Sequence, residues 1–153
     1  MKPIRNSIKA IIVANGSILL TKCEDPEGFY YLLPGGGQEP GETMIDALKR
    51  ECLEELGVEV IAGDLEIVRE YMSWNHEFAV WDADVHQIEF MFRCRVEQGV
   101  VFANPTNPDT SQIGCEWVPL EALHQARVYP SVLKSVIREQ PRIGHPIYLG
   151  DVN

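Results

Sequence analysis

Residues 33–58, LPGGGQEPGETMIDALKRECLEELGV, constrain the fold of this chain more than any other stretch. Three consecutive glycines come first, and a helix follows whose two ends are both marked in the sequence. Thr43 and Asp46 have the spacing of a capping box, and Gly57 is a typical C-terminal stop. The pattern therefore predicts a glycine-rich turn that leads into one helix over residues 43–56.

One side of this predicted helix carries carboxylates, and the neighbouring side is apolar. With about 100° of rotation per residue, Glu54 lies at about −60° from Glu51, and Glu55 lies at about +40°. The three acids therefore share an arc of about 100° over little more than one turn. A separate arc is apolar and is expected to face the core: Ile45, Leu48, Cys52 and Leu56.

Carboxylates this close together repel one another, and the helix dipole disfavours them further near the C-terminal end. A solvated acidic face is the ordinary explanation for a glutamate-rich helix. Here, however, Arg50 adjoins the acids, glycines precede the helix, and Glu42 lies in the loop between them. Glycine lets the backbone approach a ligand closely, and hard cations such as Mg²⁺ or Mn²⁺ prefer carboxylate oxygens. We therefore expect a divalent-metal site, and the resemblance described next implies that it cleaves a phosphoanhydride.

The spacing of these residues resembles the Nudix box, the signature of hydrolases that act on a nucleoside diphosphate linked to another moiety. Written as G-x5-E-x7-R-E-U-x-E-E-x-G-U, the pattern is met at its defined positions by Gly36, Glu42, Arg50, Glu51, Cys52, Glu54, Glu55, Gly57 and Val58. Cys52 stands where the family usually has an aliphatic residue, and its side chain is apolar enough to pack. Outside the box the resemblance is looser and includes the segment Trp-Val-Pro-Leu at residues 117–120.

This resemblance implies an α/β fold, an α/β/α sandwich around a mixed, largely antiparallel sheet, formed by residues 1–153 as one domain. It also implies Mg²⁺- or Mn²⁺-dependent hydrolysis, with water attacking one phosphorus and two phosphate-bearing products leaving. The implied metal ligands are the carboxylates of Glu51, Glu54 and Glu55 and the carbonyl of Gly35. A homodimer is a further expectation from the family.

The resemblance also assigns roles within and near the box. Arg50 would orient a box glutamate, Glu42 would stabilise the loop–helix arrangement, and Gly36 and Gly57 would be structural. The catalytic residues would be Glu51, Arg50 and Glu54, with Glu51 as the first choice for the general base. Because members of the family differ in their base, the second choice is Glu89 or an acid within residues 82–84.

The rest of the chain reads as strands joined by short turns, with further helix near the end. Asn15-Gly16 between two β-rich runs is a strong hairpin signal. We expect strands over residues 8–14, 17–23, 29–33, 58–62, 65–72, 88–96 and 113–118. We expect a loop over residues 98–112, helices over residues 119–126 and 130–139, and an irregular tail over residues 141–153. Residues 88–96 alternate, with Ile88, Phe90, Phe92, Cys94 and Val96 on one face.

Candidates for substrate contacts lie outside the box. Residues 73–87 form a long connection that contains Trp74, His76, Phe78 and Trp81, which would either stack on a nucleobase or plug the end of the sheet. Glu89 and Arg93 lie on the polar face of the strand over residues 88–96. Arg93 would meet a substrate phosphate or would only solvate the sheet face.

Charge disfavours several classes of partner, and cysteine usage indicates the cellular compartment. With 23 acidic against 13 basic residues the chain carries a net charge of −10, which disfavours nucleic acid and anionic membranes. The four cysteines form no CxxC pair and suit a reducing cytoplasm, where we expect the protein. The apolar run near the N-terminus is interrupted at Asn15-Gly16, so a hairpin is expected there in place of a signal peptide.

Three functions compete on these grounds. The complete acidic box favours a pyrophosphohydrolase acting on ADP-ribose, nucleotide sugars, oxidised nucleoside triphosphates or dinucleoside polyphosphates, among which the sequence does not choose. A non-catalytic nucleotide-binding or regulatory module is the alternative, although such a module would be expected to have lost box acids. An RNA cap-removing enzyme is disfavoured because the chain lacks a basic stripe.

Overall fold

Strand β1 (Arg5–Ala14) lies in the middle of a mixed sheet. The computed structural model describes residues 2–77, 79–81, 83–100, 102 and 111–153. The remaining strands are β2 (Ser17–Asp25), β3 (Gly28–Leu32), β4 (Gly35–Gly37), β5 (Ile61–Met72), β6 (His86–Arg95), β7 (Gln112–Pro119), β8 (Val128–Tyr129) and β9 (Tyr148–Asp151). Strand β1 joins the first part of the sheet, which contains β2, β3, β7 and β8, to the second part, which contains β5, β6 and β9. The helices are α1 (Met44–Leu56) and α2 (Leu133–Val136), and the 3₁₀ segments are η1 (Ser73–Asn75) and η2 (Leu120–Gln125).

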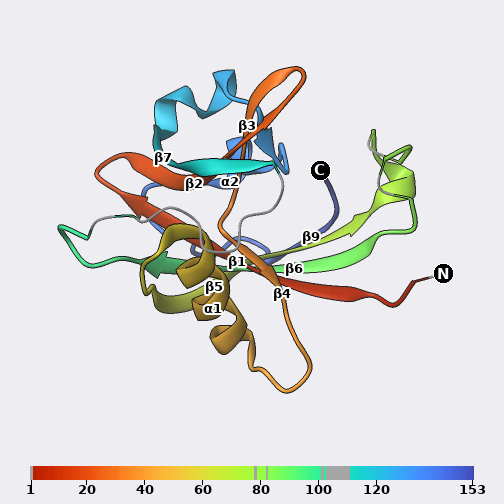
Figure 1. Cartoon of the computed structure of the whole chain (residues 1–153), viewed down its shortest axis with the longest axis horizontal. Coiled ribbons are helices and arrows are strands. Elements are labelled where there is room, and N and C mark those ends of the chain that lie inside the picture. Colours follow the sequence, from red (N-terminus) through yellow and green to blue (C-terminus); the bar gives the residue numbers. More distant parts are fainter. Residues whose placement is uncertain (1, 78, 82, 101, 103–110) are drawn as a thin grey trace.

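The sheet has the order β8-β3-β2-β1-β6-β5-β9, with β4 also paired to β1 and β7 also paired to β2. Five of these pairings are antiparallel, whereas β1–β6, β3–β8 and β5–β9 are parallel. In the view of Figure 1, α1 lies below β1, and β3, β7 and α2 lie above it. The predicted mixed, largely antiparallel sheet of the α/β class is therefore confirmed.

The hairpin and the first helix form as their local signals predict. Asn15 and Gly16 both have positive φ, 51° and 74°, which is the geometry of a two-residue turn between twisted strands. Thr43 and Asp46 exchange the two hydrogen bonds of a capping box, and the helix ends at Gly57 in the left-handed region. Residues within or next to the helix therefore fix both ends of α1, and with them the positions of its acids along the helix.

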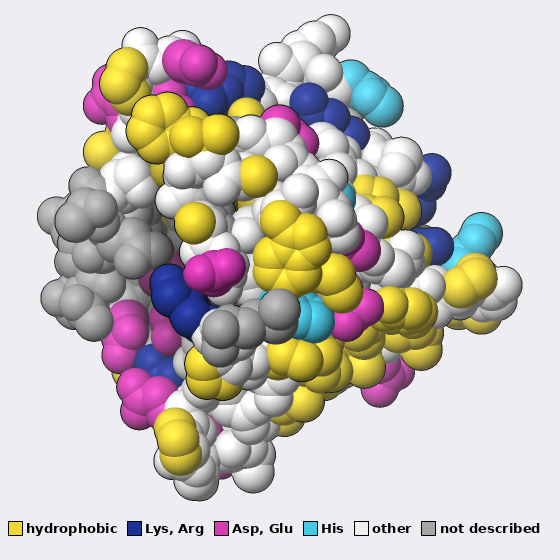
Figure 2. Space-filling model, turned by 90° about the vertical axis from the view of Figure 1, so that its right-hand side faces the viewer, with side chains coloured by type: hydrophobic (Ala, Val, Ile, Leu, Met, Phe, Trp, Pro, Cys, Tyr) yellow, Lys and Arg dark blue, Asp and Glu magenta, His cyan; other side chains and the backbone are white. Residues whose placement is uncertain are grey.

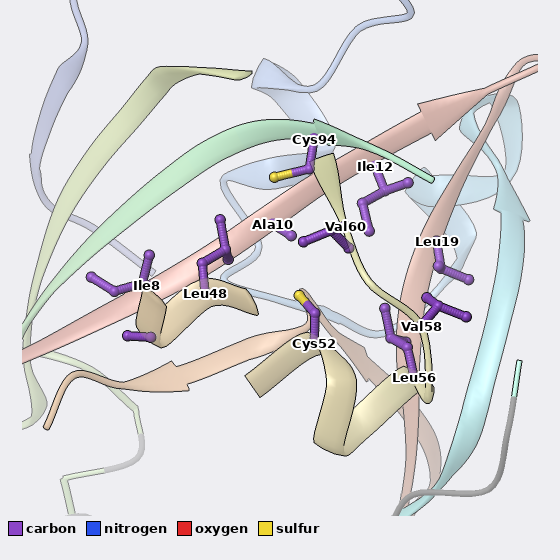
Figure 3. Close-up of a cluster of buried hydrophobic side chains, with 11 residues drawn as sticks. Ile8, Ala10, Ile12, Leu19, Leu48, Cys52, Leu56, Val58, Val60 and Cys94 are labelled. Atoms are coloured by element: carbon purple, nitrogen blue, oxygen red, sulfur yellow. The ribbon is translucent and has the colours of Figure 1, made fainter. Parts of the chain in front are cut away.

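Both faces of β1 are buried, which explains its apolar run. Ile8, Ala10 and Ile12 pack with Leu48 and Cys52 of α1 in one core cluster, which Figure 3 shows between the strand and the helix. Ile11 points to the opposite face, where the second cluster also contains Ile67, Met91, Leu133 and Ile137. The sheet is therefore covered by α1 on one face and by η2 and α2 on the other.

Several sequence-based boundaries were wrong. One strand, β5 (Ile61–Met72), replaces the two strands predicted over residues 58–62 and 65–72. Its register against β6 shifts between Ala62 and Leu65, across Gly63 and Asp64, and again between Leu65 and Ile67. The irregular tail contains β9, which pairs parallel to β5. The glycine run itself forms β4 against β1.

The two C-terminal helices are also shorter than the sequence predicted. The helix predicted over residues 119–126 is the 3₁₀ segment η2 (Leu120–Gln125). The helix predicted over residues 130–139 is the single turn α2, which stops where Ile137 becomes extended. On the face of β6 that was predicted to be polar, Glu89 and Met91 are buried in the structure. Met91 packs in the second core cluster. Most of the predicted loop over residues 98–112 lies outside the described residues.

The connection between η1 and β6 faces solvent. Val80 and Trp81 are each 83% exposed, and Trp74 of η1 is 46% exposed. Figure 2 views the molecule from this side and shows hydrophobic side chains among acidic and basic ones. These exposed tryptophans do not plug the end of the sheet as core residues would.

Leu48 tests how much the packing of α1 contributes to stability. Its side chain is completely buried, so Leu48→Ala is expected to lower the free energy of unfolding by about 2–5 kcal/mol through lost burial and a residual cavity. Urea unfolding followed by circular dichroism measures the change. Leu53→Ala is the matched control, because Leu53 lies on the same helix but is 48% exposed. An equal loss in both variants would contradict the packing assigned to α1.

Candidate metal and catalytic site

The β4–α1 connection brings the glycines and the acids of the box together. Pairing with β1 places Gly35 opposite Lys9, and Gly36 opposite Ile8. A Cβ at Gly35, whose φ is +136°, would lie 2.0 Å from the carbonyl oxygen of Ile8, so only glycine fits this approach. Strand pairing thus holds the glycine backbone beside the acidic side of α1.

Arg50 is the centre of the hydrogen-bond network of the site. Its Nε donates to Glu42 at 2.6 Å, and its Nη1 donates to Glu51 at 2.9 Å. Its Nη2 donates to the carbonyl of Gly37 at 3.0 Å and to Glu42 at 3.1 Å. The Nη1 atom also lies 3.7 Å from Glu54. A planar guanidinium can make these contacts at once, whereas a lysine ammonium cannot.

The other acids of the box contact the glycines. Glu55 accepts a hydrogen bond from the backbone N–H of Gly35 at 2.9 Å. The carboxylate of Glu51 lies against Gly36 so closely that a Cβ there would be 2.5 Å from it. The side-chain amide of Gln112 on β7 donates to the backbone carbonyl of Glu55 at 3.3 Å. This hydrogen bond connects the C-terminal end of α1 to the strand that pairs with β2.

A cavity of about 700 Å³ opens beside this network. It is lined by the start of β1 at residues 4–6, by residues 37–42 of the β4–α1 connection and by Glu51. Its volume is in the range of small-molecule sites. Glu51 is therefore the acid of the α1 face that lines this cavity, and Glu42 lines it from the loop; both accept hydrogen bonds from Arg50.

The residues fit a hard divalent cation by their chemistry. Glu51, Glu54 and Glu55 offer carboxylate oxygens on one helix face, and the missing Cβ of Gly36 leaves room for the Glu51 carboxylate. Among the described residues, no three Asp, Glu, His or Cys side chains already converge as a ligand cage. Arg50 contacts Glu51 and Glu54, and the N–H of Gly35 donates to Glu55, so each of the three acids has a hydrogen-bond or ion-pair partner within the box.

Ion pairing shifts the titration of the loop acid Glu42. Its hydrogen bond from Arg50 lowers the pKa of Glu42 from 4.5 to about 2, with the backbone N–H of Glu39 contributing to the same shift. The pKa of Arg50 is raised in turn, chiefly by Glu42. Burial raises the pKa of the Cys52 thiol, so this box position is an uncharged packing residue. The loop carboxylate and the guanidinium are thus both ionised at neutral pH.

Glu42 predicts a pH dependence of stability. Because its pKa is lower in the folded protein, its contribution is fully present above about pH 4.5 and is lost as the pH falls towards about 2. Glu42→Gln should therefore be less stable than wild type at neutral pH, with the difference shrinking below pH 4.5. Urea midpoints at several pH values measure this. A difference that is the same at acidic and neutral pH would contradict the ion pair.

The predicted substrate residues are not gathered around the box. Trp74 lies edge-on to His86, and His76 contacts Asp151 and stacks on Tyr71. Phe78 and Asp82 lie outside the described residues. Trp81 is exposed to solvent. The substrate roles of the two tryptophans stay predictions.

Glu89 and Arg93 have partners within the fold. Glu89 is buried and accepts from Arg69 Nε at 2.5 Å, and the charge of Arg69 lowers its pKa against the effect of burial. Arg93 binds Glu66 at 2.7 Å and donates to the carbonyl of Arg138. Both side chains therefore form ion pairs that connect β6 to β5. Their catalytic or substrate-binding roles stay predictions.

Lys9 is a residue of the site that the sequence reasoning missed. Its Nζ donates to the carbonyl of Gly35 at 3.2 Å. A lysine between the fully buried residues Ile8 and Ala10 of an apolar strand is the signal that could have identified it. Its partner could not be identified in the same way, because the pairing of β1 with β4 is not visible in the sequence.

Comparison with known proteins agrees with this architecture. The NUDIX domain family matches residues 3–139. The nucleoside triphosphatase NudI of Salmonella newport is 28% identical over 144 residues, covering 87% of this chain and 98% of that protein. NudI of Enterobacter sp. is 48% identical over 56 residues, which cover 35% of this chain and 40% of the relative.

Solved structures share the fold at lower identity. A NUDIX hydrolase from Nitrosomonas europaea has a TM-score of 0.69 at 15% identity, and the match covers 99% of this chain and 81% of that protein's chain. An ADP-ribose pyrophosphatase from Streptococcus suis has a TM-score of 0.64 at 19% identity, covering 96% and 98%.

Fold, box and relatives together define a hydrolase of phosphoanhydrides. The chain belongs to the NUDIX domain family, as the match over residues 3–139 shows, and it is a nucleotide pyrophosphohydrolase. In the described part of the chain, no helix has the length and apolar character needed to cross a membrane.

Proposed function

We propose that the protein uses Mg²⁺ or Mn²⁺ to hydrolyse a phosphoanhydride in a nucleoside diphosphate linked to another moiety. The observation that carries this proposal is the Arg50 network, which holds Glu51 beside Gly36 and beside a cavity of about 700 Å³. Glu54 and Glu55 complete the acidic face of α1. Such a site concentrates negative charge where a divalent cation and a pyrophosphate would meet.

The chain's own residues have separate tasks in this mechanism. When bound, Mg²⁺ or Mn²⁺ lowers the pKa of a coordinated water and neutralises charge on pyrophosphate oxygens. Glu51, Glu54, Glu55 and the Gly35 carbonyl would hold the cation. Glu51 faces the cavity and would accept the proton of the attacking water.

Arg50 orients Glu51 and is itself fixed by Glu42 and the Gly37 carbonyl. Because Arg50 remains charged and hydrogen-bonded, the carboxylate of Glu51 is restricted to few positions. A restricted base is aligned with its water more often than a freely rotating one. Glu42 therefore acts on Glu51 through Arg50.

Our first candidate for the substrate is a nucleoside triphosphate, and our second candidate is ADP-ribose. The relative that this chain matches over 98% of its length is named a nucleoside triphosphatase. ADP-ribose follows from a fold neighbour named an ADP-ribose pyrophosphatase, which carries less weight because its identity is 19%. The protein would act as one domain over residues 1–153 in the cytoplasm, and a homodimer stays a prediction.

A hydrolysis panel tests the proposal. Nucleoside triphosphates, ADP-ribose and nucleotide sugars are incubated with Mg²⁺, with Mn²⁺ or with EDTA, and products are separated by ion-exchange chromatography. Metal-dependent release of two phosphate-bearing products from at least one compound is expected. Nucleotide binding by calorimetry with no product from any compound would favour the alternative, a non-catalytic nucleotide-binding or regulatory module.

A further inference from the structure

Lys9 brings a positive charge to the backbone of the glycine run. It lies on β1 directly opposite Gly35 of β4, and its Nζ donates to the Gly35 carbonyl at 3.2 Å. Lys9 is partly buried, and its neighbours in the strand, Ile8 and Ala10, are both inaccessible to solvent. A charged group at such a position needs compensating partners to be tolerated.

The partners of Lys9 belong to the fold and to the box. One is the Gly35 carbonyl, whose residue also donates its N–H to the box acid Glu55. Another is the buried carboxylate of Glu89, whose pKa is lowered chiefly by Arg69 and further by Lys9. Because Glu89 already has Arg69 at 2.5 Å, Lys9 is a second cation on this carboxylate and is not needed to neutralise it.

The carbonyl that Lys9 binds is also the backbone ligand assigned to the divalent cation in the proposed function. An ammonium 3.2 Å from that oxygen would lie close to a cation bound to the same oxygen, and the two positive charges would repel. The repulsion falls when the ammonium turns towards an anion. A nucleotide bound at the metal would bring phosphate oxygens to that place.

We propose that Lys9 competes with the divalent cation for the Gly35 carbonyl and, once displaced, binds a phosphate oxygen of the nucleotide. This inference rests on the proposed function. It gives Lys9 two effects of opposite sign. It weakens metal binding in the absence of substrate, and it strengthens binding of the anionic substrate. Neither effect follows from a lysine that only stabilises the pairing of β1 with β4.

The experiment compares wild type with Lys9→Met, Lys9→Arg and Lys22→Met. The dissociation constant for Mn²⁺ is measured from the electron paramagnetic resonance signal of free Mn²⁺, without nucleotide. Lys9→Met should bind Mn²⁺ at least about threefold more tightly, because a nearby positive charge is removed. Its KM for the substrate found in the hydrolysis panel should rise about tenfold, as expected for loss of one charge-assisted hydrogen bond.

The other variants separate charge from position. Lys9→Arg keeps the charge and should stay near wild type in both measurements. Lys22→Met makes the same change in net charge on β2, where Lys22 contacts Glu116 and the ring of Phe29, and it should change neither value. If Lys9→Met does not fold, Lys9→Gln takes its place, since it also removes the charge and keeps a polar end.

The outcomes are distinct. Unchanged or weaker Mn²⁺ binding in Lys9→Met, or an unchanged KM, overturns the proposal for Lys9. The same holds if Lys22→Met reproduces both effects, because net charge alone would then explain them. Failure of wild type itself to bind Mn²⁺ and to hydrolyse any nucleotide would overturn the proposed function instead.

Discussion

Replacing Glu54 by glutamine is expected to reduce kcat for nucleotide hydrolysis by about two to three orders of magnitude. The substitution keeps the size of the side chain and removes one of the three charges on the acidic face of α1. Glu54 is partly exposed and lies 3.7 Å from Arg50 Nη1, so the helix should fold unchanged. Steady-state hydrolysis with Mg²⁺ or Mn²⁺ measures the loss, and the Mn²⁺ dissociation constant should rise in parallel.

Glu59→Gln is the matched control for this substitution. Glu59 follows the helix, is exposed, and undergoes the same loss of charge without belonging to the acidic face. It should keep wild-type activity. Full activity in both Glu54→Gln and Glu55→Gln would show that the box acids do not hold the metal.

Gly36→Ala is expected to lower kcat by about 100-fold while leaving the fold intact. Its new Cβ would lie 2.5 Å from the carboxylate of Glu51, too close for both to keep their places. The flexible end of the glutamate is the part that gives way, because the backbone of Gly36 is held by β1. Glu51 would then leave its position at Arg50 and beside the cavity.

Gly114→Ala provides a control for the extra methyl group. Gly114 is also a strand glycine, on β7, but a Cβ there meets no atom within 4 Å. Both variants should have melting temperatures close to wild type, and only Gly36→Ala should lose activity. A fully active Gly36→Ala would contradict the position assigned to Glu51.

Local signals predicted the parts of the fold that local physics decides. The limits of α1 follow from Thr43, Asp46 and Gly57, which all act within one turn of the helix ends. The Asn15-Gly16 hairpin is equally local. Strand β9 and the pairing of β4 are different, because each depends on a partner strand far away in the sequence. Neither segment has a strand pattern of its own.

The candidate site divides in the same way. The Arg50 network was predictable because Glu42, Arg50 and Glu51 lie within ten residues, on one loop and one helix. Lys9 and Gln112 reach the box across the sheet, and only strand register reveals their contacts. The network around Glu89 was missed for the same reason. Its partner Arg69 comes from the neighbouring strand β5.

Gly35 can also serve as a spectroscopic probe of its own site. Its amide N–H donates a hydrogen bond to the Glu55 carboxylate, and its carbonyl oxygen accepts one from the Lys9 ammonium. A negative charge therefore acts on one end of this residue and a positive charge on the other. In protein labelled with ¹⁵N and ¹³C, the amide resonance of Gly35 would respond to Glu55 and the carbonyl carbon to Lys9. A diamagnetic Mg²⁺ titration would therefore be followed at both ends of a single glycine, before any nucleotide is added.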